Sequence, residues 1–141
     1  MLIGEGPGKN EDEQGRPFVG RAGDLLDELL NEVGLSREDV FITNVVKCRP
    51  PDNRDPKKDE IETCNPYLKR QINLIEPKVI ATLGNHATKT LIGKTGISTI
   101  HGDEFEYNNI KLIPLYHPAA GLYNPDLKDD MEKDMIKLLD Y

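Results

Sequence analysis

Short apolar runs alternate along this chain with stretches of helical periodicity, and this alternation constrains the fold most. The runs at residues 1–3, 40–46 and 79–83 are rich in aliphatic and β-branched side chains with little polar alternation, which is typical of parallel strands buried on both faces. Between the first two, the leucines at positions 25, 26, 29 and 30 form one apolar stripe and predict a helix over 22–33. Strands that alternate with helices predict a three-layer α/β/α sandwich with a mostly parallel central sheet.

The same periodicities predict the remaining elements. Three further helices are expected, over residues 59–75, 85–92 and 127–139. We expect the first of these to break before Pro66, because proline removes a backbone donor. A hairpin is expected over residues 105–114, with its turn at Asn108-Asn109. Two long loops are expected over residues 9–20 and 49–56. The length of 141 residues suits a single domain over 1–141.

Charge restricts the partners of this chain. The formal net charge of −7 argues against unselective attraction to phosphate backbones, because such binding depends on Lys and Arg displacing counterions. Lys47, Arg49 and Arg54 lie in one basic stretch, which is either a local DNA contact or an ordinary solvated loop. No apolar run reaches the roughly 18 residues of a membrane span, and no signal peptide is recognised. We therefore expect a cytoplasmic protein with no membrane partner.

Cys48 and Cys64 are the two cysteines of the sequence. With no secretory signal, a structural disulfide is not expected. From the residues alone, two free thiols are favoured over a metal site, because zinc and iron–sulfur sites normally take four such ligands.

Four loops begin at the carboxyl ends of predicted strands, which is where open α/β sheets bind ligands. The first contains the glycine-rich segment 4–8, whose glycines let backbone amides approach a ligand, while Glu5 and Glu11 supply carboxylates. The segment is a poor phosphate cradle, because it lacks the P-loop lysine. The alternative is a tight turn after a strand.

Three other side chains in or beside these loops have both a structural and a functional interpretation. Phe18 lies among prolines and glycines and either fills the edge of the core or serves a site. Asn44 lies in an apolar strand, where its amide either caps the strand or reads an amide-like base edge. His117 precedes Pro118 at the mouth of a strand and is either a satisfied histidine or a catalyst.

Three segments, in this order, resemble one known family. GEGPGKNEDEQGRPFVGRAGDLL, NVVKCRPPDNRDP and HPAA are similar to the motifs of the family-4, iron–sulfur type uracil-DNA glycosylases, and the resemblance extends from Met1 to about Pro125. It implies the fold of the wider uracil-DNA glycosylase superfamily. It also implies hydrolysis of the N-glycosidic bond of flipped-out uracil in DNA, which leaves an abasic site for base excision repair.

The resemblance implies a role for each matching residue. Glu5 and Gly6 would line the uracil pocket. Phe18 would stack on the flipped base, and Asn44 would read its amide edge. His117 would donate a hydrogen bond to uracil O2.

The resemblance also implies residues that act on the sugar, on the attacking water and on the surrounding DNA. Glu11 and Asn53 match positions that assist at the sugar or at the attacking water. Family members often carry Leu-Arg after the histidine motif, whereas this chain has Leu122 and Tyr123. Leu122 would intercalate into the base stack at the place that the flipped uracil vacates. Tyr123 would stack at the position where the arginine of other family members contacts phosphate. The DNA-contacting residues expected in all are Lys47, Arg49, Arg54 and Leu122.

The cofactor of the family is a [4Fe–4S] cluster held by four cysteines. Cys48 and Cys64 match the later two ligands, and the first two lie upstream of the first motif in the family. We therefore expect a domain that lacks the cluster-binding segment, and we doubt the cluster, because two thiolates do not hold a cubane securely. No cofactor is expected to be needed for the bond cleavage.

Two other functions remain open. The chain could be a DNA-binding module of the same fold with weakened turnover, or a small nucleotide-metabolite hydrolase that uses Glu5 and Glu11. The joint presence of Phe18, Asn44 and His117 favours the glycosylase, because a pure binding module has no use for a donor to O2. The expected partner is uracil-containing DNA, single- or double-stranded, bound by a monomer.

Overall fold

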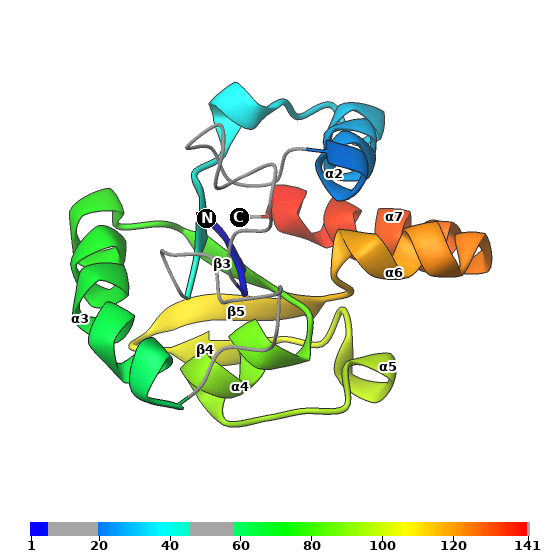
Figure 1. Cartoon of the computed structure of the whole chain (residues 1–141). Helices are drawn as coiled ribbons and strands as arrows, with labels where there is room; N and C mark the ends of the chain where they lie inside the picture. Colours follow the sequence, from blue (N-terminus) through cyan, green and yellow to red (C-terminus); the bar gives the residue numbers. More distant parts are fainter. Residues whose placement is uncertain (6–19, 46–57, 141) are drawn as a thin grey trace.

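The computed structural model describes residues 1–5, 20–45 and 58–140, with side chains described from residue 66 onward in the last segment. A five-stranded sheet forms the middle layer, in the order β2-β1-β3-β5-β4 (Figure 1). Its strands are β1 (Leu2–Gly4), β2 (Ile42–Asn44), β3 (Val79–Leu83), β4 (Phe105–Tyr107) and β5 (Ile110–Leu115). All neighbouring strands pair in parallel except β4, which is antiparallel to β5. The predicted mostly parallel sheet is confirmed.

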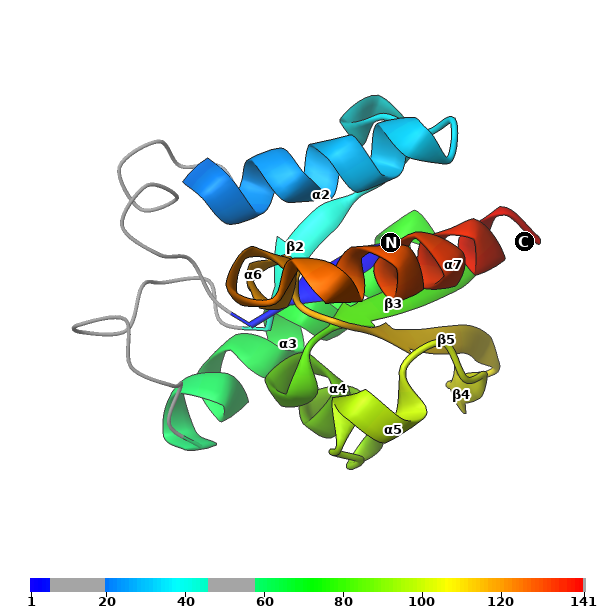
Figure 2. The same cartoon turned by 90° about the vertical axis from the view of Figure 1, so that its right-hand side faces the viewer.

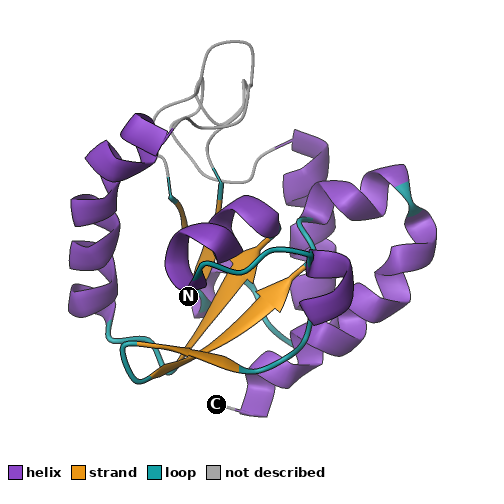
Figure 3. Ribbon diagram, turned by 90° about the horizontal axis from the view of Figure 1, so that it is seen from below, coloured by secondary structure: helices purple, strands orange, loops and turns teal. Residues whose placement is uncertain are grey.

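Helices cover both faces of this sheet (Figures 2 and 3). One face is covered by α2 (Gly20–Glu32), α6 (Pro118–Tyr123) and α7 (Lys128–Lys137). The other face is covered by α3 (Lys58–Ile75) and α4 (Asn85–Ile92). Shorter helical turns lie at α5 (Ile97–Ile100), Arg37–Asp39, Pro125–Leu127 and Leu138–Asp140. The predicted α/β/α sandwich is therefore confirmed.

Two hydrophobic cores form because neighbouring residues of a strand point to opposite faces. Leu2 of β1 and Ile113 of β5 pack under α2 and α7. Ile3 and Leu112, one position away on the same strands, pack under α3 and α4. The predicted stripe of leucines on α2 is buried in the first core. Both faces of the sheet are thus closed by apolar packing.

Two predictions about these elements are wrong. The helix at Pro66 does not break, since α3 runs unbroken from Lys58 to Ile75 with the proline inside it. Its later turns bury Leu68 and Ile72 against the sheet, and this packing keeps the helix together across the missing backbone donor. The strand predicted over 40–46 is shorter, and β2 lies at an edge of the sheet, although it pairs in parallel as expected.

Turn residues end the elements where the sequence indicates. Gly34 closes α2 with a φ of +84°, which an αL helix terminus requires and glycine adopts without strain. Asn108 and Asn109 join β4 to β5 with φ of 47° and 68°. Two positive φ values are the mark of a type I′ hairpin turn, so the predicted hairpin is confirmed.

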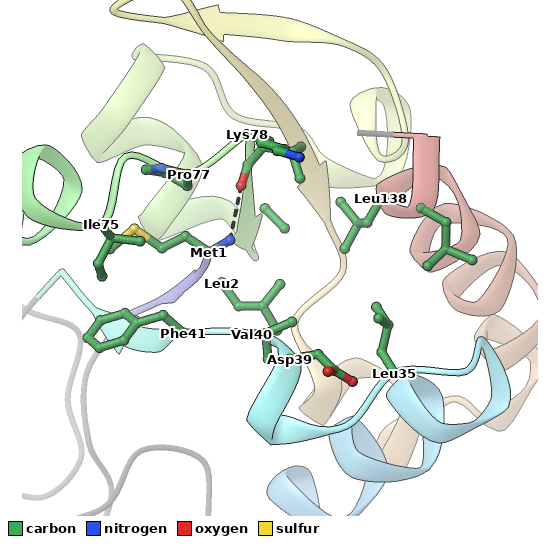
Figure 4. A pocket seen from close by; sticks show the side chains of 13 residues that line it. Met1, Leu2, Leu35, Asp39, Val40, Phe41, Ile75, Pro77, Lys78 and Leu138 are labelled. Carbon is green, nitrogen blue, oxygen red and sulfur yellow. Dashed lines mark hydrogen bonds between the residues drawn. The ribbon is translucent and has the colours of Figure 1, made fainter.

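A pocket of about 340 Å³ opens at the amino ends of the strands (Figure 4). Leu2, Val40, Phe41 and Leu138 are among its apolar lining residues. Within the described segments, no helix is long and apolar enough to cross a membrane.

We expect Leu26→Ala to lower the free energy of unfolding by about 2 to 5 kcal/mol, because it opens a cavity in the first core. Leu26 has no measurable exposure, whereas Leu74 on α3 is 78% exposed. Leu74→Ala is the matched control and should change stability by no more than about 0.5 kcal/mol. Urea denaturation followed by circular dichroism measures both. Equal losses in the two variants would contradict the two-core packing.

Candidate functional site

The carboxyl ends of four parallel strands meet at one edge of the sheet. Glu5, Asn44, Gly84 and His117 lie at or just after the ends of β1, β2, β3 and β5. Val45 N–H donates to Gly4 O at 2.9 Å, and Gly84 N–H donates to Leu115 O at 2.8 Å, so neighbouring strand ends are tied together. At about 4.8 Å between strands, the row from β2 to β5 spans roughly 14 Å. Side chains reaching inward from both ends of such a row can enclose a planar ring of nucleobase size.

His117 is the N-cap residue of α6. Its Nδ1 atom accepts a hydrogen bond from the backbone N–H of Ala119 at 3.1 Å, and Pro118 occupies the first helical position. Burial lowers the pKa of the His117 imidazole to about 4. The ring is therefore neutral near pH 7. Because Nδ1 is the acceptor, the proton of the neutral ring resides on Nε2, which makes Nε2–H the donor.

Gly84 sits directly against this histidine. A Cβ atom on Gly84 would lie 3.1 Å from the His117 Cβ, and the φ of Gly84 is +89°, which side-chain-bearing residues rarely adopt. Thr88 Oγ1 donates to Gly84 O at 2.8 Å, and the Thr88 and Thr82 hydroxyls lie 2.8 Å apart in the core. The sequence predicted the strand over 79–83, which Gly84 follows directly, but did not predict the packing of Gly84 against His117. A glycine immediately after a buried strand was the available signal.

Asn44 and Glu5 occupy the ends of the two neighbouring strands. Asn44 pairs in register with Gly4 and is 7% exposed, and its carboxamide Oδ1 atom is screened from solvent. Glu5 follows β1 directly and is half-buried. Thr43 Oγ1 donates to Gln71 Oε1 of α3 at 3.1 Å, which anchors β2 from behind. A carboxamide and a carboxylate are thus held at the same edge as His117.

Leu122 and Tyr123 end α6, about one and a half turns from His117. Leu122 is partly buried and packs against the first core. Tyr123 is 90% exposed. Of these two residues, Tyr123 offers the larger surface to a partner, and the DNA contact predicted for Leu122 stays a prediction.

Several predicted site residues lie outside the described residues. They are Gly6, Glu11, Phe18, Lys47, Cys48, Arg49, Asn53 and Arg54. Cys64 has its backbone in α3, and its side chain is outside the description as well. The structure therefore brings together Glu5, Asn44 and His117 from the predicted set.

The residues of this sequence do not by themselves fit an iron–sulfur cubane. Such a cluster takes four thiolates, and the sequence contains two cysteines. In the part of the chain that is described, no group of three or more His, Cys, Asp or Glu side chains is arranged to hold a metal ion.

Known proteins of one family are similar to this chain over nearly its whole length. The family model of the uracil DNA glycosylase superfamily matches residues 1–140. The type-4 uracil-DNA glycosylase of Sulfurisphaera tokodaii is 52% identical over 98% of this chain and 67% of its own length. That of Saccharolobus solfataricus is 53% identical over 98% of this chain and 68% of its own length. That of Archaeoglobus fulgidus is 47% identical over 98% of this chain and 74% of its own length. The chain therefore belongs to the uracil DNA glycosylase superfamily, and within it to the type-4 uracil-DNA glycosylases.

Proposed function

We propose that this chain hydrolyses the N-glycosidic bond of uracil in DNA and leaves an abasic site. Membership of the type-4 family supports this reaction. The observation that carries it is the neutral His117, whose Nδ1 is occupied by the Ala119 N–H and whose donor is therefore Nε2–H. A donor of fixed tautomer at the carboxyl edge of the sheet is what the leaving uracil requires.

The chemistry explains why a neutral donor is useful. Breaking the bond between uracil N1 and the sugar leaves negative charge on the base, chiefly on its oxygens and N1, and positive character on the sugar. A hydrogen bond from His117 Nε2–H to uracil O2 stabilises the base, and one such donor in a dry pocket contributes about 3 to 4 kcal/mol. Glu11 and Asn53 are proposed, from their positions in the motifs, to stabilise the sugar or to orient the attacking water.

Recognition of the base is assigned to the strand ends. The Asn44 carboxamide offers one acceptor and two donors, which matches the N3–H and O4 of uracil. Its burial at the end of a paired strand holds that pattern in place. Glu5 and Gly6 are proposed to form the pocket floor, and Phe18 to stack on the flipped base.

Contact with DNA is assigned to a few residues, because the net charge of −7 argues against unselective attraction to phosphate backbones. Lys47, Arg49 and Arg54 are proposed to contact phosphates, and Leu122 to enter the base stack. Tyr123, at 90% exposure, is proposed to stack on a base beside the vacated position. The chain acts as a cytoplasmic monomer in this proposal, on single- or double-stranded DNA.

The test is incubation with single- and double-stranded oligonucleotides that contain one uracil, followed by alkali. Strand cleavage at the uracil is expected, and matched oligonucleotides with thymine or cytosine should remain intact. Folded protein that releases no uracil from either substrate would overturn the proposal. Binding of those oligonucleotides without release would favour a binding module instead.

His117→Ala is expected to lower the single-turnover rate by about 10²- to 10³-fold, because it removes the donor to O2. That substitution also removes the N-cap of α6. His117→Asn is the matched variant, because asparagine is among the best N-cap residues and keeps the acceptor for the Ala119 N–H. Both variants should be slow, and His117→Asn should keep the wild-type melting temperature. A fast His117→Asn variant would move the catalytic role elsewhere.

The pH dependence follows from the burial of His117. Its pKa falls from 6.5 to about 4 on folding, so the unfolded chain binds more protons between these values and stability rises with pH through this window. We expect the His117 ring to titrate with a midpoint near 4, measured by NMR with His117→Asn for assignment. This residue should therefore add no step to the rate between pH 5.5 and 8. A midpoint near 6.5 would contradict the buried neutral ring.

Tyr123→Ala is expected to weaken binding of uracil-containing DNA about 5- to 150-fold, because one base–aromatic stack contributes about 1 to 3 kcal/mol. Tyr67→Ala is the matched control, since Tyr67 is also exposed, at 62%, but lies on α3 across the sheet. Fluorescence anisotropy with a labelled oligonucleotide measures both. Equal affinities in the two variants would exclude the contact at Tyr123.

A further inference from the structure

A chain of contacts away from the strand ends joins α7 to the residue before His117. The Asp134 side chain of α7 is 6% exposed, and its Oδ2 accepts a hydrogen bond from His101 Nδ1 at 2.6 Å. The His101 ring lies against the Tyr116 ring, with centroids 4.5 Å apart and 33° between the planes. Tyr116 is followed directly by His117. These contacts therefore run without interruption from α7 to the backbone that carries His117.

The turn that carries His101 is held from two sides. Gly102 N–H donates to Pro114 O of β5 at 2.8 Å, and Lys137 Nζ of α7 donates to Gly102 O at 2.9 Å. Gly102 has a φ of +79°, and a Cβ atom there would collide with Asp134 Oδ1. Glycine at this position therefore lets α7 approach the turn closely, and the turn cannot shift without disturbing both β5 and α7.

The buried carboxylate is not needed to fill space. Burial raises the pKa of Asp134, while the hydrogen bond from His101 and the charge of Lys137 oppose that rise. Apolar side chains of similar volume often replace buried ion pairs at no cost to stability. Met131 and Met135 of the same helix already bury apolar side chains in the core. The Asp134 carboxylate sets the orientation of the His101 ring, because a hydrogen bond is directional and contact with an apolar side chain is not.

We propose that Asp134 and His101 are positioning residues for His117, an inference that rests on the proposed function. Asp134 orients the His101 ring, and the ring packs against Tyr116. This packing fixes the backbone between the end of β5 and the start of α6, and therefore the position of His117. Neither residue touches the substrate. The effect on rate follows because a reacting group misplaced by about 1 Å can cost about 10²-fold.

The experiment separates this support from general stability. His101→Ala removes the ring, whereas His101→Phe keeps a ring beside Tyr116 and removes the bond to Asp134. Asp134→Leu keeps the branching of the side chain at Cγ, with a larger volume, and removes the carboxylate. Arg37→Gln is the matched control, because Arg37 forms a partly buried ion pair with Asp27 of α2, and neither residue of that pair belongs to the contacts among Asp134, His101 and Tyr116.

Four quantities are measured for each variant of the whole chain. These are the melting temperature, the single-turnover rate at saturating protein with the protein concentration for half-saturation, and the NMR signals of the His117 ring and the Ala119 amide. The Ala119 amide is informative because it donates to His117 Nδ1.

We expect His101→Ala and Asp134→Leu to lower the saturated rate about tenfold, with half-saturation changed less than about twofold. Both should also shift the His117 and Ala119 signals in protein that remains folded. His101→Phe should recover part of the rate lost in His101→Ala, because the ring still supports Tyr116. Arg37→Gln should leave the rate and the signals unchanged even if it lowers the melting temperature.

Unchanged rates and unshifted signals in folded His101→Ala and Asp134→Leu would overturn the positioning role. Losses that simply follow the melting temperature, in Arg37→Gln as in the others, would also overturn it. A wild-type protein that does not release uracil would overturn the proposed function instead. In that case the His117 and Ala119 signals still decide whether Asp134 and His101 set the position of His117.

Discussion

Burial of the central sheet on both faces is the constraint on which the rest of this structure depends. Each strand must present apolar side chains upward and downward, as Leu2 and Ile3 do on β1. A sheet of this kind is built from parallel strands with helical crossovers. Parallel strands place all their carboxyl ends at one edge, and Glu5, Asn44 and His117 lie at or just after these ends. The location of the site is thus a consequence of how the core is closed.

Burial also decides the chemistry of the site. His117 has an ordinary imidazole, but its enclosure beside Gly84 keeps the ring neutral. The α6 N-cap then selects which nitrogen carries the proton. One packing arrangement therefore sets both the charge and the tautomer of the donor, and a leaving uracil anion needs a donor with a defined proton. Gly84 contributes to this arrangement, because the absence of a side chain there allows the end of β3 to lie close to His117.

Much of the fold was predictable from residue patterns, and the errors have physical causes. The leucine stripe of α2, the Asn108-Asn109 turn and the strand β3 depend on local periodicity and backbone preference, and all three were predicted correctly. The break at Pro66 was predicted from a local penalty that packing of α3 on the sheet outweighs. The edge position of β2 could not be read from its apolar run, because strand order depends on contacts between distant segments.

For the site, the sequence by itself determined which residues and motifs are present, and these are enough to identify the family. It indicated that His117 follows a strand end and that Asn44 lies in an apolar strand, because strands follow from hydrophobic patterning, whereas the structure ends that strand at Asn44. Only the tertiary structure decided that His117 is neutral, that Gly84 lies against it, and that Asp134 reaches Tyr116 through His101. The physical reason is that charge state and ring orientation depend on burial and on partners far away in the chain, which no local pattern specifies.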